Sequence, residues 1–175
     1  MLKRNIILIG FMGSGKTTVG SRLAELLTYQ FKDSDQMIEK KCGDTINHIF
    51  AVHGEEYFRN QETDLLKGIA PVLNHTVLSA GGGLPLREQN AQLIKELGYV
   101  VFLKTSLQTT ISRLMGDSSR PLLQGENLEK KLEQMLEIRT PIYEKAAQKI
   151  ITTDGRSINE IAQLIMENYL KQIYK

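Results

Sequence analysis

The sequence predicts a three-layer α/β fold, in which helices cover both faces of a parallel β-sheet. Short apolar segments alternate with longer segments of helical periodicity, which is the rhythm of β-α-β units. The apolar segments are hydrophobic throughout rather than alternating with polar residues, as strands buried on both faces are. No internal repeat or low-complexity tract interrupts this order, so we expect a single domain over residues 1–175.

Each predicted element follows from a local pattern. The strands are the apolar runs at Asn5 to Ile9, near Phe31 to Asp33, at Thr76 to Ser79, at Tyr99 to Leu103 and around Ile150. The helices are predicted from Lys16 toward Leu27, within Asp44 to Ala70, after Arg87 and after Ser157. The last helix begins with Ser157 and Glu160 at the spacing of a capping box, and its apolar residues share one face, so it should pack on the sheet.

The composition argues against several classes of protein. The net charge of +2 is small, and Lys and Arg are interleaved with Asp and Glu, so we expect no nucleic-acid partner. No apolar run approaches the ~20 residues needed to span a bilayer, so we expect no membrane partner. Cys42 is the one cysteine and cannot form an intramolecular disulfide, which fits a reducing compartment. We therefore expect a cytoplasmic protein.

A phosphate-binding loop lies between the first strand and the first helix. Residues Gly10 to Thr17 read GFMGSGKT and match G-x-x-x-x-G-K-[ST] in the strand-loop-helix context that this motif requires. Its glycines let successive backbone N–H groups surround an oxyanion beside the helix N-terminus. Lys16 would reach the β- and γ-phosphates, and Thr17 would bind Mg²⁺. The motif predicts binding of ATP or GTP.

The motif alone does not separate a kinase from a GTPase switch, a motor or an ATPase. The sequence contains no N-K-x-D motif for guanine recognition, which argues against a GTPase switch. Neither Leu78-Ser79-Ala80 nor Phe102-Leu103-Lys104 ends a strand with the Asp of a Walker B motif. The carboxylate that holds Mg²⁺ must therefore come from elsewhere in the chain.

Asp33 and Asp35 are the candidates for that role. They fall where the second strand ends, at the edge of the sheet where ligands bind in open α/β folds. Asp33 could hold Mg²⁺ directly or through water and orient an attacking hydroxyl, while Asp35 could accept hydrogen bonds from substrate hydroxyls. The alternative is a turn with a helix N-cap, which D-x-D sequences also form.

Glycines and arginines supply further candidates. Gly81, Gly82 and Gly83 follow another strand at the same edge and would let a substrate approach the backbone, unless they form only a flexible turn. Arg59 and Arg139 could bind anionic groups through their planar forks. The alternative for each arginine is a solvated surface position, which for Arg59 would include ion pairs with glutamates on the same helix.

The segment from Met115 to Asn127 is rich in Gly, Ser, Asp and Pro and carries Arg120. We interpret this segment as a mobile lid, and an ordinary solvent-exposed connection is the alternative. Its arginine is a candidate for binding anions. His48, His53 and His75 lack the spacing of a metal site, so we expect structural roles for them.

Taken together, these motifs resemble those of the shikimate kinase family, a branch of the nucleoside monophosphate kinase-like P-loop proteins. The resemblance runs along nearly the whole chain. It is carried by GFMGSGKTTVG from Gly10, DSDQMIE from Asp33, GEEYFR ending at Arg59, SAGGG ending at Gly83, RPLL from Arg120 and RTPIY from Arg139. The phosphate loop is common among ATPases, but its combination with the other motifs is specific.

The resemblance implies a P-loop kinase fold with a central five-stranded parallel sheet, a lid at about 115–127 and a helical substrate-binding region at about 33–66. It implies that ATP is bound by Gly13, Ser14, Gly15, Lys16, Thr17, Thr18, Arg113 and Arg120, with Arg113 against the adenine. It implies that shikimate is bound by Asp35, Arg59, Gly81, Gly82, Gly83 and Arg139, with both arginines on its carboxylate. Lys16, Asp33 and Arg120 would be catalytic, and Thr17 and Asp33 would hold Mg²⁺.

We therefore expect an enzyme that transfers the γ-phosphate of ATP to the 3-hydroxyl of shikimate, giving shikimate 3-phosphate and ADP. The resemblance assigns this step to the biosynthesis of chorismate and the aromatic amino acids, and we expect a monomer. Two alternatives remain open. One is a kinase of another small metabolite, such as gluconate or a nucleoside monophosphate, and the other is a catalytically silent nucleotide-binding module that regulates a partner.

Overall fold

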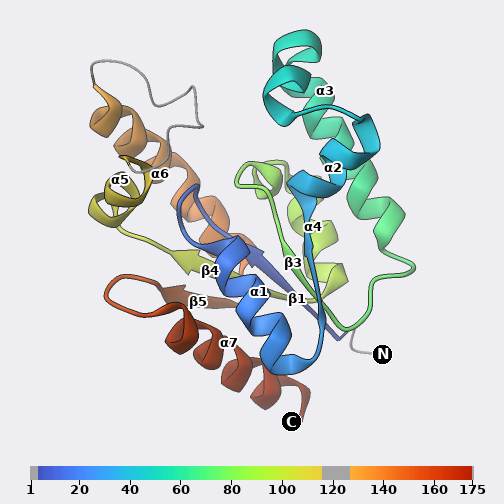
Figure 1. Ribbon diagram of the computed structural model, residues 1–175, viewed down its shortest axis with the longest axis vertical. Coiled ribbons are helices and arrows are strands. Elements are labelled where there is room, and N and C mark those ends of the chain that lie inside the picture. The colour runs from blue at the N-terminus through green and yellow to red at the C-terminus, as the bar shows by residue number, and fades with distance from the viewer. Residues whose placement is uncertain (1–3, 116–126, 175) are drawn as a thin grey trace.

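The computed structural model describes residues 4–115 and 127–174, and these residues form a parallel β-sheet of five strands. The strands lie side by side in the order β2-β3-β1-β4-β5 (Figure 1). Their bounds are β1 Asn5–Ile9, β2 Gln30–Asp33, β3 Thr76–Ser79, β4 Tyr99–Lys104 and β5 Lys149–Thr152. β1 is the central strand and pairs in parallel with both β3 and β4.

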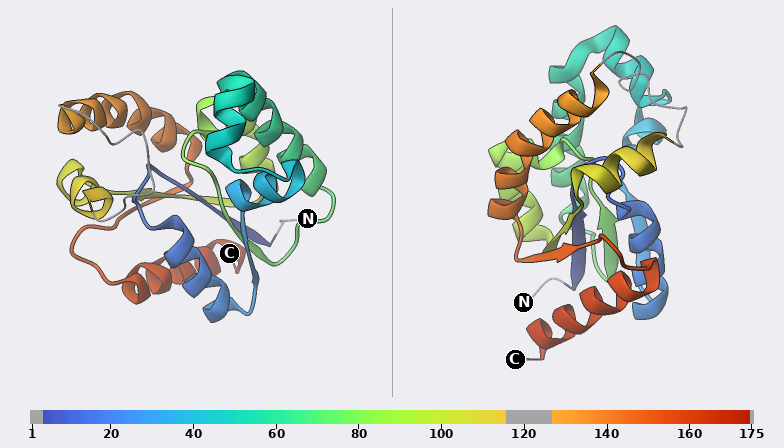
Figure 2. Two further views of the ribbon diagram at one scale, coloured as in Figure 1. Left: turned by 45° about the horizontal axis from the view of Figure 1, so that its top comes forward. Right: turned by 90° about the vertical axis from the view of Figure 1, so that its left-hand side faces the viewer.

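Helices cover both faces of this sheet, so the molecule has three layers (Figure 2). One face is covered by α1 (Lys16–Leu27) and α7 (Ile158–Ile173). The other is covered by α3 (Ile46–Ile69), the short 3₁₀-helix η1 (Leu84–Leu86), α4 (Glu88–Leu97) and α6 (Leu128–Ala146). The remaining helices are α2 (Ser34–Cys42) and α5 (Leu107–Met115). No helix in the described part of the chain is long and apolar enough to cross a membrane.

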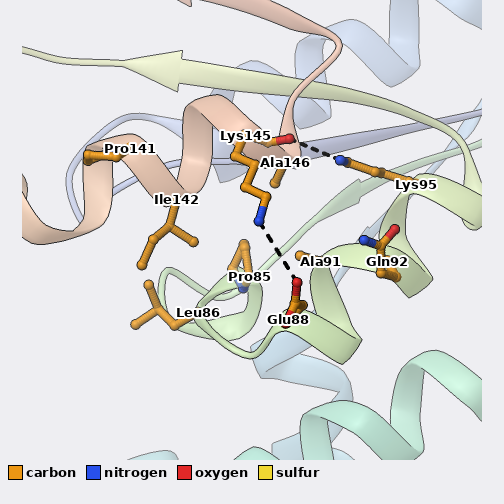
Figure 3. Close-up of a pocket in the computed structure, with 10 residues that line it drawn as sticks. All are labelled: Pro85, Leu86, Glu88, Ala91, Gln92, Lys95, Pro141, Ile142, Lys145 and Ala146. Carbon is orange, nitrogen blue, oxygen red and sulfur yellow. Dashed lines mark hydrogen bonds and ion pairs between the residues drawn. The ribbon is translucent and has the colours of Figure 1, made fainter.

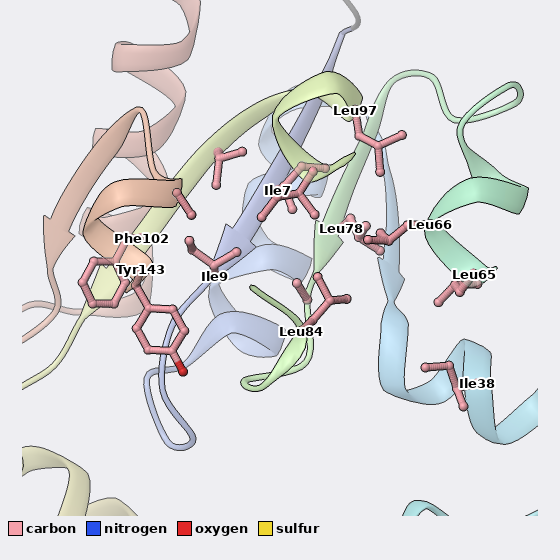
Figure 4. Close-up of a cluster of buried hydrophobic side chains, with 14 of the residues drawn as sticks. Ile7, Ile9, Ile38, Leu65, Leu66, Leu78, Leu84, Leu97, Phe102 and Tyr143 are labelled. Atoms are coloured by element: carbon pink, nitrogen blue, oxygen red, sulfur yellow. The ribbon is translucent and has the colours of Figure 1, made fainter. Parts of the chain in front are cut away.

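The central strand is anchored from both sides of the sheet. Every residue of β1 is buried, and alternate side chains enter opposite layers. Ile7 and Ile9 join the layer beneath α3, α4 and α6 (Figure 4), whereas Ile6 and Leu8 join the layer beneath α1 and α7. Burial of one such side chain contributes about 1.5–3 kcal/mol relative to exposure. The loop that follows β1 therefore starts from a fixed point.

The topology opens a crevice between the carboxyl ends of β1 and β3. The chain leaves β1 toward α1 on one face of the sheet and leaves β3 toward η1 and α4 on the other. Neighbouring strands with diverging connections leave such a crevice, and open α/β folds bind ligands there. Asp33 and Ser79 end their strands in register at this edge, where Gly10 begins the loop after β1.

The five predicted strands and the capping box of Ser157 and Glu160 are confirmed. The 3₁₀-helix η1 and three helices, α2, α5 and α6, are not predicted by the apolar periodicity. α6 has few buried residues and contains Pro141, which breaks the usual helical pattern. The segment predicted as a lid begins at the last residue of α5 and ends just before α6, and residues 116–126 of it lie outside the described part of the chain.

Candidate active site

The loop after β1 forms an anion-binding turn at the N-terminus of α1. Gly13 and Gly15 adopt φ angles of 74° and 88°, which residues with side chains rarely adopt. Gly15 is the N-cap of α1 and has no side chain to occupy the first N–H groups of the helix. Nζ of Lys16 donates hydrogen bonds to the carbonyls of Gly10 at 2.9 Å and Phe11 at 3.0 Å. The loop thus combines backbone donors with an ammonium group, an arrangement suited to phosphates.

Asp33 contacts both the phosphate loop and helix α2. Its Oδ2 accepts a hydrogen bond of 3.1 Å from Oγ1 of Thr17. Its Oδ1 accepts the backbone N–H groups of Asp35 at 3.0 Å and Gln36 at 3.4 Å, so Asp33 is the N-cap of α2. The helix-cap interpretation is therefore correct for Asp33, and the same carboxylate also faces the phosphate loop.

The side chains beside the phosphate loop fit a magnesium ion. Mg²⁺ prefers oxygen ligands and is commonly held by one or two protein oxygens together with water and substrate phosphates. Oγ1 of Thr17 and Oδ2 of Asp33 supply two such oxygens 3.1 Å apart. Within residues 4–115 and 127–174, no group of three or more His, Cys, Asp or Glu side chains could hold a metal. Nucleotide phosphates would have to complete the coordination.

A pocket of about 240 Å³ opens at the carboxyl ends of β1, β2 and β3. Its lining comes from the phosphate loop, the end of β2 and the loop after β3: Met12, Gly13, Gly15, Lys16, Thr17, Thr18, Asp33, Asp35, Ser79, Ala80, Gly81 and Gly82. Five of the six residues predicted to bind ATP from Gly13 to Thr18, both aspartates and two of the three glycines therefore share one cavity. Ser14 is buried within the phosphate loop itself.

Side chains from three helices approach the glycine triplet, Gly81–Gly83. A methyl group on Gly81 would lie 2.5 Å from Oδ1 of Asp35, and one on Gly83 would overlap the guanidinium of Arg59. The hydroxyl of Tyr143 donates a hydrogen bond of 2.6 Å to the carbonyl of Gly82. The N–H of Gly81 donates to Oγ of Ser34 at 2.8 Å, so it is already satisfied within the protein. Close packing of these side chains explains why glycine is needed at Gly81 and Gly83.

Arg59 is held between two glutamates of its own helix, α3. Its Nη1 donates to Oε2 of Glu62 at 2.8 Å, and its Nε and Nη2 donate to Oε1 of Glu55 at 3.2 and 3.1 Å. The arginine side chain is only 12% exposed, and Cζ lies 5.5 Å from the centre of the Phe58 ring. The ion pairs expected from the helical spacing are present. The pair with Glu62 is not a surface pair, because Arg59 is largely buried and Glu62 completely so, whereas Glu55 is exposed.

Glu62 is an acid whose charge depends on pH near neutrality. Burial raises the pKa of its carboxyl to about 7, although the hydrogen bond and charge of Arg59 favour the ionised form. The charge of Asp35 also raises this pKa, and that of Arg87 lowers it. Oε1 of Glu62 would lie 3.2 Å from a methyl group on Gly81. A titratable group therefore lies against the glycine triplet.

Arg139 and Tyr143 lie one helical turn apart on α6. Cζ of Arg139 is 5.6 Å from the centre of the Phe11 ring, so α6 brings this arginine over the phosphate loop. Burial raises the pKa of Tyr143, while the charge of Arg139, a hydrogen bond with it and the charge of Arg59 oppose that rise. Both arginines predicted to bind a carboxylate are therefore close to Tyr143, one from α6 and the other from α3.

Arg113 reaches the phosphate loop from α5. Its Nη1 donates a hydrogen bond of 2.9 Å to the carbonyl of Gly13, and its side chain is exposed. Arg120 lies outside the described residues. Of the two arginines predicted to bind ATP, Arg113 therefore lies beside the phosphate loop.

The predicted site residues that the structure describes converge on one edge of the sheet, but two residues of this region are not predicted from the sequence. Glu62 follows Arg59 by three positions, and Tyr143 follows Arg139 by four. Residues at these spacings share a helix face. Helical spacing from a predicted site arginine is therefore the signal that could have found both.

Comparisons with known proteins find relatives along most of the chain. The family model described as shikimate kinase matches residues 12–170. A shikimate kinase of Thioalkalivibrio sulfidiphilus is 45% identical over 165 residues, covering 94% of this chain and 86% of the relative. The structure of shikimate kinase from Acinetobacter baumannii in complex with shikimate has a TM-score of 0.91 and 42% identity, covering 99% of this chain and 96% of that one.

A gluconokinase from Sinorhizobium meliloti also superposes, with a TM-score of 0.58 over 96% of this chain and 92% of that one. Its sequence identity is 16%, so the likeness reflects the fold alone. The family match and the relatives at 42% and 45% identity carry more weight than this likeness, because their sequences as well as the fold match this chain over most of its length. The chain belongs to the shikimate kinase family.

Proposed function

We infer that this protein is an ATP-dependent kinase that transfers the γ-phosphate of ATP to the 3-hydroxyl of shikimate, releasing shikimate 3-phosphate and ADP. The observation that carries this inference is the approach of Asp35, Arg59 and Tyr143, from three helices, to the glycine triplet beside the phosphate loop. The Acinetobacter baumannii enzyme, solved in complex with shikimate, supports the choice of substrate.

The side chains around the triplet match the chemistry of a small ring acid that carries hydroxyl groups. Arg59 and Arg139 would bind the carboxylate, because a planar guanidinium can donate to both of its oxygens. Asp35 would accept hydrogen bonds from ring hydroxyls. The glycine triplet would let the ring approach the backbone, with Gly81 contributing space rather than its N–H, which Ser34 already accepts.

Phosphoryl transfer needs in-line positioning and neutralisation of negative charge more than covalent help from the protein. Lys16 and the N–H groups of the phosphate loop would hold the β- and γ-phosphates. Thr17 and Asp33 would hold Mg²⁺, which supplies positive charge to the phosphate oxygens when bound. Asp33 lies between the loop and Asp35 in the chain and could also orient the attacking hydroxyl or accept its proton.

Several assignments rest on the family resemblance and stay proposals. Arg113 would contact the adenine, and Arg120 would neutralise the γ-phosphate. The segment at 115–127 would close over ATP and exclude water, which otherwise competes with the substrate hydroxyl for the phosphate. The expectations of a monomer, a cytoplasmic location and the absence of nucleic-acid or membrane partners also stay predictions.

Shikimate-dependent release of ADP by the purified protein tests substrate and activity together. We expect release with ATP, Mg²⁺ and shikimate, and only background release when shikimate is omitted or replaced by gluconate or a nucleoside monophosphate. Lys16→Met should abolish the signal. Turnover with gluconate or a nucleotide, and none with shikimate, would reverse the choice of substrate. Binding of Mg·ATP without transfer to any acceptor would favour the regulatory nucleotide-binding module.

A further inference from the structure

Tyr143 joins helix α6 to the glycine triplet through a buried contact. Its hydroxyl donates a hydrogen bond of 2.6 Å to the carbonyl of Gly82, and the residue is completely buried. Its ring packs against Phe102 of β4 with the ring centroids 5.1 Å apart, and Figure 4 shows the two rings next to each other with the hydroxyl pointing out of the cluster. The sheet therefore fixes the ring, and the polar tip reaches the loop.

Tyr143 also lies between the two arginines proposed to bind the substrate carboxylate. Arg139 is one turn earlier on the same helix and interacts with the Tyr143 hydroxyl. On the other side, Gly82 is followed by Gly83, against which the guanidinium of Arg59 packs. A continuous series of contacts thus runs from Arg139 through the tyrosine hydroxyl and the triplet to Arg59.

The polar contacts between α6 and α4 lie at the surface. Nζ of Lys95 donates an exposed hydrogen bond of 2.9 Å to the carbonyl of Lys145. Lys145 and Glu88 form an ion pair of 3.8 Å with side chains 80% and 82% exposed, so it stabilises little. Figure 3 shows this ion pair beside a pocket that separates α6 from η1 and α4. Facing side chains in this pocket include Pro85, Leu86, Pro141 and Ile142. The hydrogen bond from the Tyr143 hydroxyl to Gly82 differs from these exposed contacts because it is short and its tyrosine is buried.

We propose that Tyr143 is a positioning residue of the shikimate site: its hydroxyl holds the glycine triplet, and with it Arg59, at the separation from Arg139 that one carboxylate can bridge. The proposal rests on the proposed function, since it concerns how that substrate is bound. Tyr143 has no proton-transfer role in it. Burial raises the pKa of the hydroxyl, so it remains a hydrogen-bond donor at neutral pH.

Tyr143→Phe is the direct test, because it removes the hydroxyl and keeps the ring that packs on Phe102. Loss of one neutral buried hydrogen bond should raise KM for shikimate by about three- to tenfold. The kcat should stay within about twofold, and KM for ATP should not change, because the phosphate loop keeps its own contacts. If Tyr143 contributed only to stability, its substitution would not raise KM for shikimate while leaving KM for ATP unchanged.

Tyr169→Phe is the matched control. Tyr169 is also buried, with 1% exposed, and its hydroxyl lies 3.1 Å from that of Tyr29. It lies on α7, on the other face of the sheet, and packs against Tyr99, the first residue of β4. This position is at the amino ends of the strands, away from the pocket. Tyr169→Phe should lower the melting temperature about as much as Tyr143→Phe does. It should leave the KM values for shikimate and for ATP unchanged.

The outcomes distinguish the positioning role from the function on which it rests. If the wild-type protein shows no shikimate-dependent turnover, the proposed function fails. If the wild type turns over shikimate but Tyr143→Phe has the same shikimate KM as Tyr169→Phe, the positioning role is wrong. Calorimetric titration with shikimate alone provides a second readout should Tyr143→Phe lose turnover for another reason, and an unchanged Kd there would equally overturn the proposal.

Discussion

The carboxylate of Glu62 accepts a hydrogen bond of 2.8 Å from the guanidinium of Arg59 although Glu62 is completely buried. Taking a carboxylate out of water is costly unless its partners compensate fully. Burial raises the pKa of Glu62 to about 7, and the hydrogen bond and charge of Arg59 offset that rise only in part. An anionic substrate at Arg59 would compete for the same cation, so substrate binding and protonation of Glu62 should be coupled.

The first prediction concerns stability against pH. A glutamate carboxyl in the unfolded chain loses its proton near 4.5, whereas the folded protein retains the proton of Glu62 up to about 7. Stability should therefore fall as pH rises through this interval, by on the order of 3 kcal/mol from this group. Glu62→Gln cannot titrate and should lose that component. Urea unfolding of both proteins at a series of pH values from about 4.5 to 8 measures the difference.

Glu55→Gln is the control for that experiment, because Glu55 is the other glutamate bonded to Arg59 and its side chain is 68% exposed. It should keep the wild-type dependence of stability on pH. Parallel curves for the wild type and Glu62→Gln would contradict the assignment. The same pair of variants tests the coupling to substrate, since only Glu62→Gln should flatten the dependence of shikimate KM on pH near 7.

The second prediction concerns Gly83, whose backbone conformation suits any residue. Its φ and ψ are −89° and −11°, so Gly83→Ala adds no backbone strain, but the new methyl group would overlap the guanidinium of Arg59. Because that group ends a flexible side chain, we expect Arg59 to move and KM for shikimate to rise about tenfold, which corresponds to roughly 1.4 kcal/mol. Steady-state kinetics at saturating ATP measure this change.

Gly68→Ala provides the comparison for this variant. Gly68 lies on the same helix as Arg59, and a methyl group there would meet nothing within 4 Å. This change should raise stability by about 0.5–1 kcal/mol through helix propensity alone. It should leave KM for shikimate unchanged. An equal effect of both alanines on KM would mean that the packing of Gly83 on Arg59 is irrelevant to binding.

The third prediction separates the two ligands. Arg139→Ala should raise KM for shikimate by about 30-fold or more, as expected when one partner of a buried charge pair is removed. ATP binding should remain largely intact, because Arg139 contacts the phosphate loop only at the Phe11 ring, and the hydrogen bonds of Lys16 to the loop carbonyls remain. Titrations with each ligand separately, by calorimetry, measure both. Arg22→Ala, at an exposed arginine paired with Glu25 on α1, should change neither. Equal loss of both ligands would refute the role of Arg139.

The fourth prediction distinguishes the capping and metal roles of Asp33. Asparagine is as good an N-cap as aspartate, so Asp33→Asn should preserve the melting temperature but raise the Mg²⁺ concentration needed for half-maximal activity. Asp33→Ala should raise the Mg²⁺ requirement in the same way and should also lower stability by about 1 kcal/mol, because the cap is missing. Magnesium titrations and thermal unfolding of the two variants separate the effects. Unchanged magnesium dependence in Asp33→Asn would restrict Asp33 to capping.

Local sequence determines the phosphate loop and the strand ends that surround it. The conformation of the loop depends on glycines at Gly13 and Gly15, and its position depends on the apolar strand directly before it. Parallel strands end at one edge, so the β-α-β pattern is enough to predict that Asp33 and the glycine triplet lie near the loop. Short-range geometry and strand order are sufficient for this part of the site.

The remaining part depends on packing between distant segments. The hydrogen bond from Tyr143 to Gly82 joins residues 61 positions apart, and the burial of Glu62 requires that α3 pack against the loop after β3. Neither burial nor the pKa shift that follows from it can be read from a helical ion-pair spacing, which is the same on the surface and in the interior. The order of residues establishes which chemical groups are available and at which edge of the sheet they lie. Which of these groups lose contact with water is set by tertiary packing, because desolvation depends on the neighbours that the fold brings together.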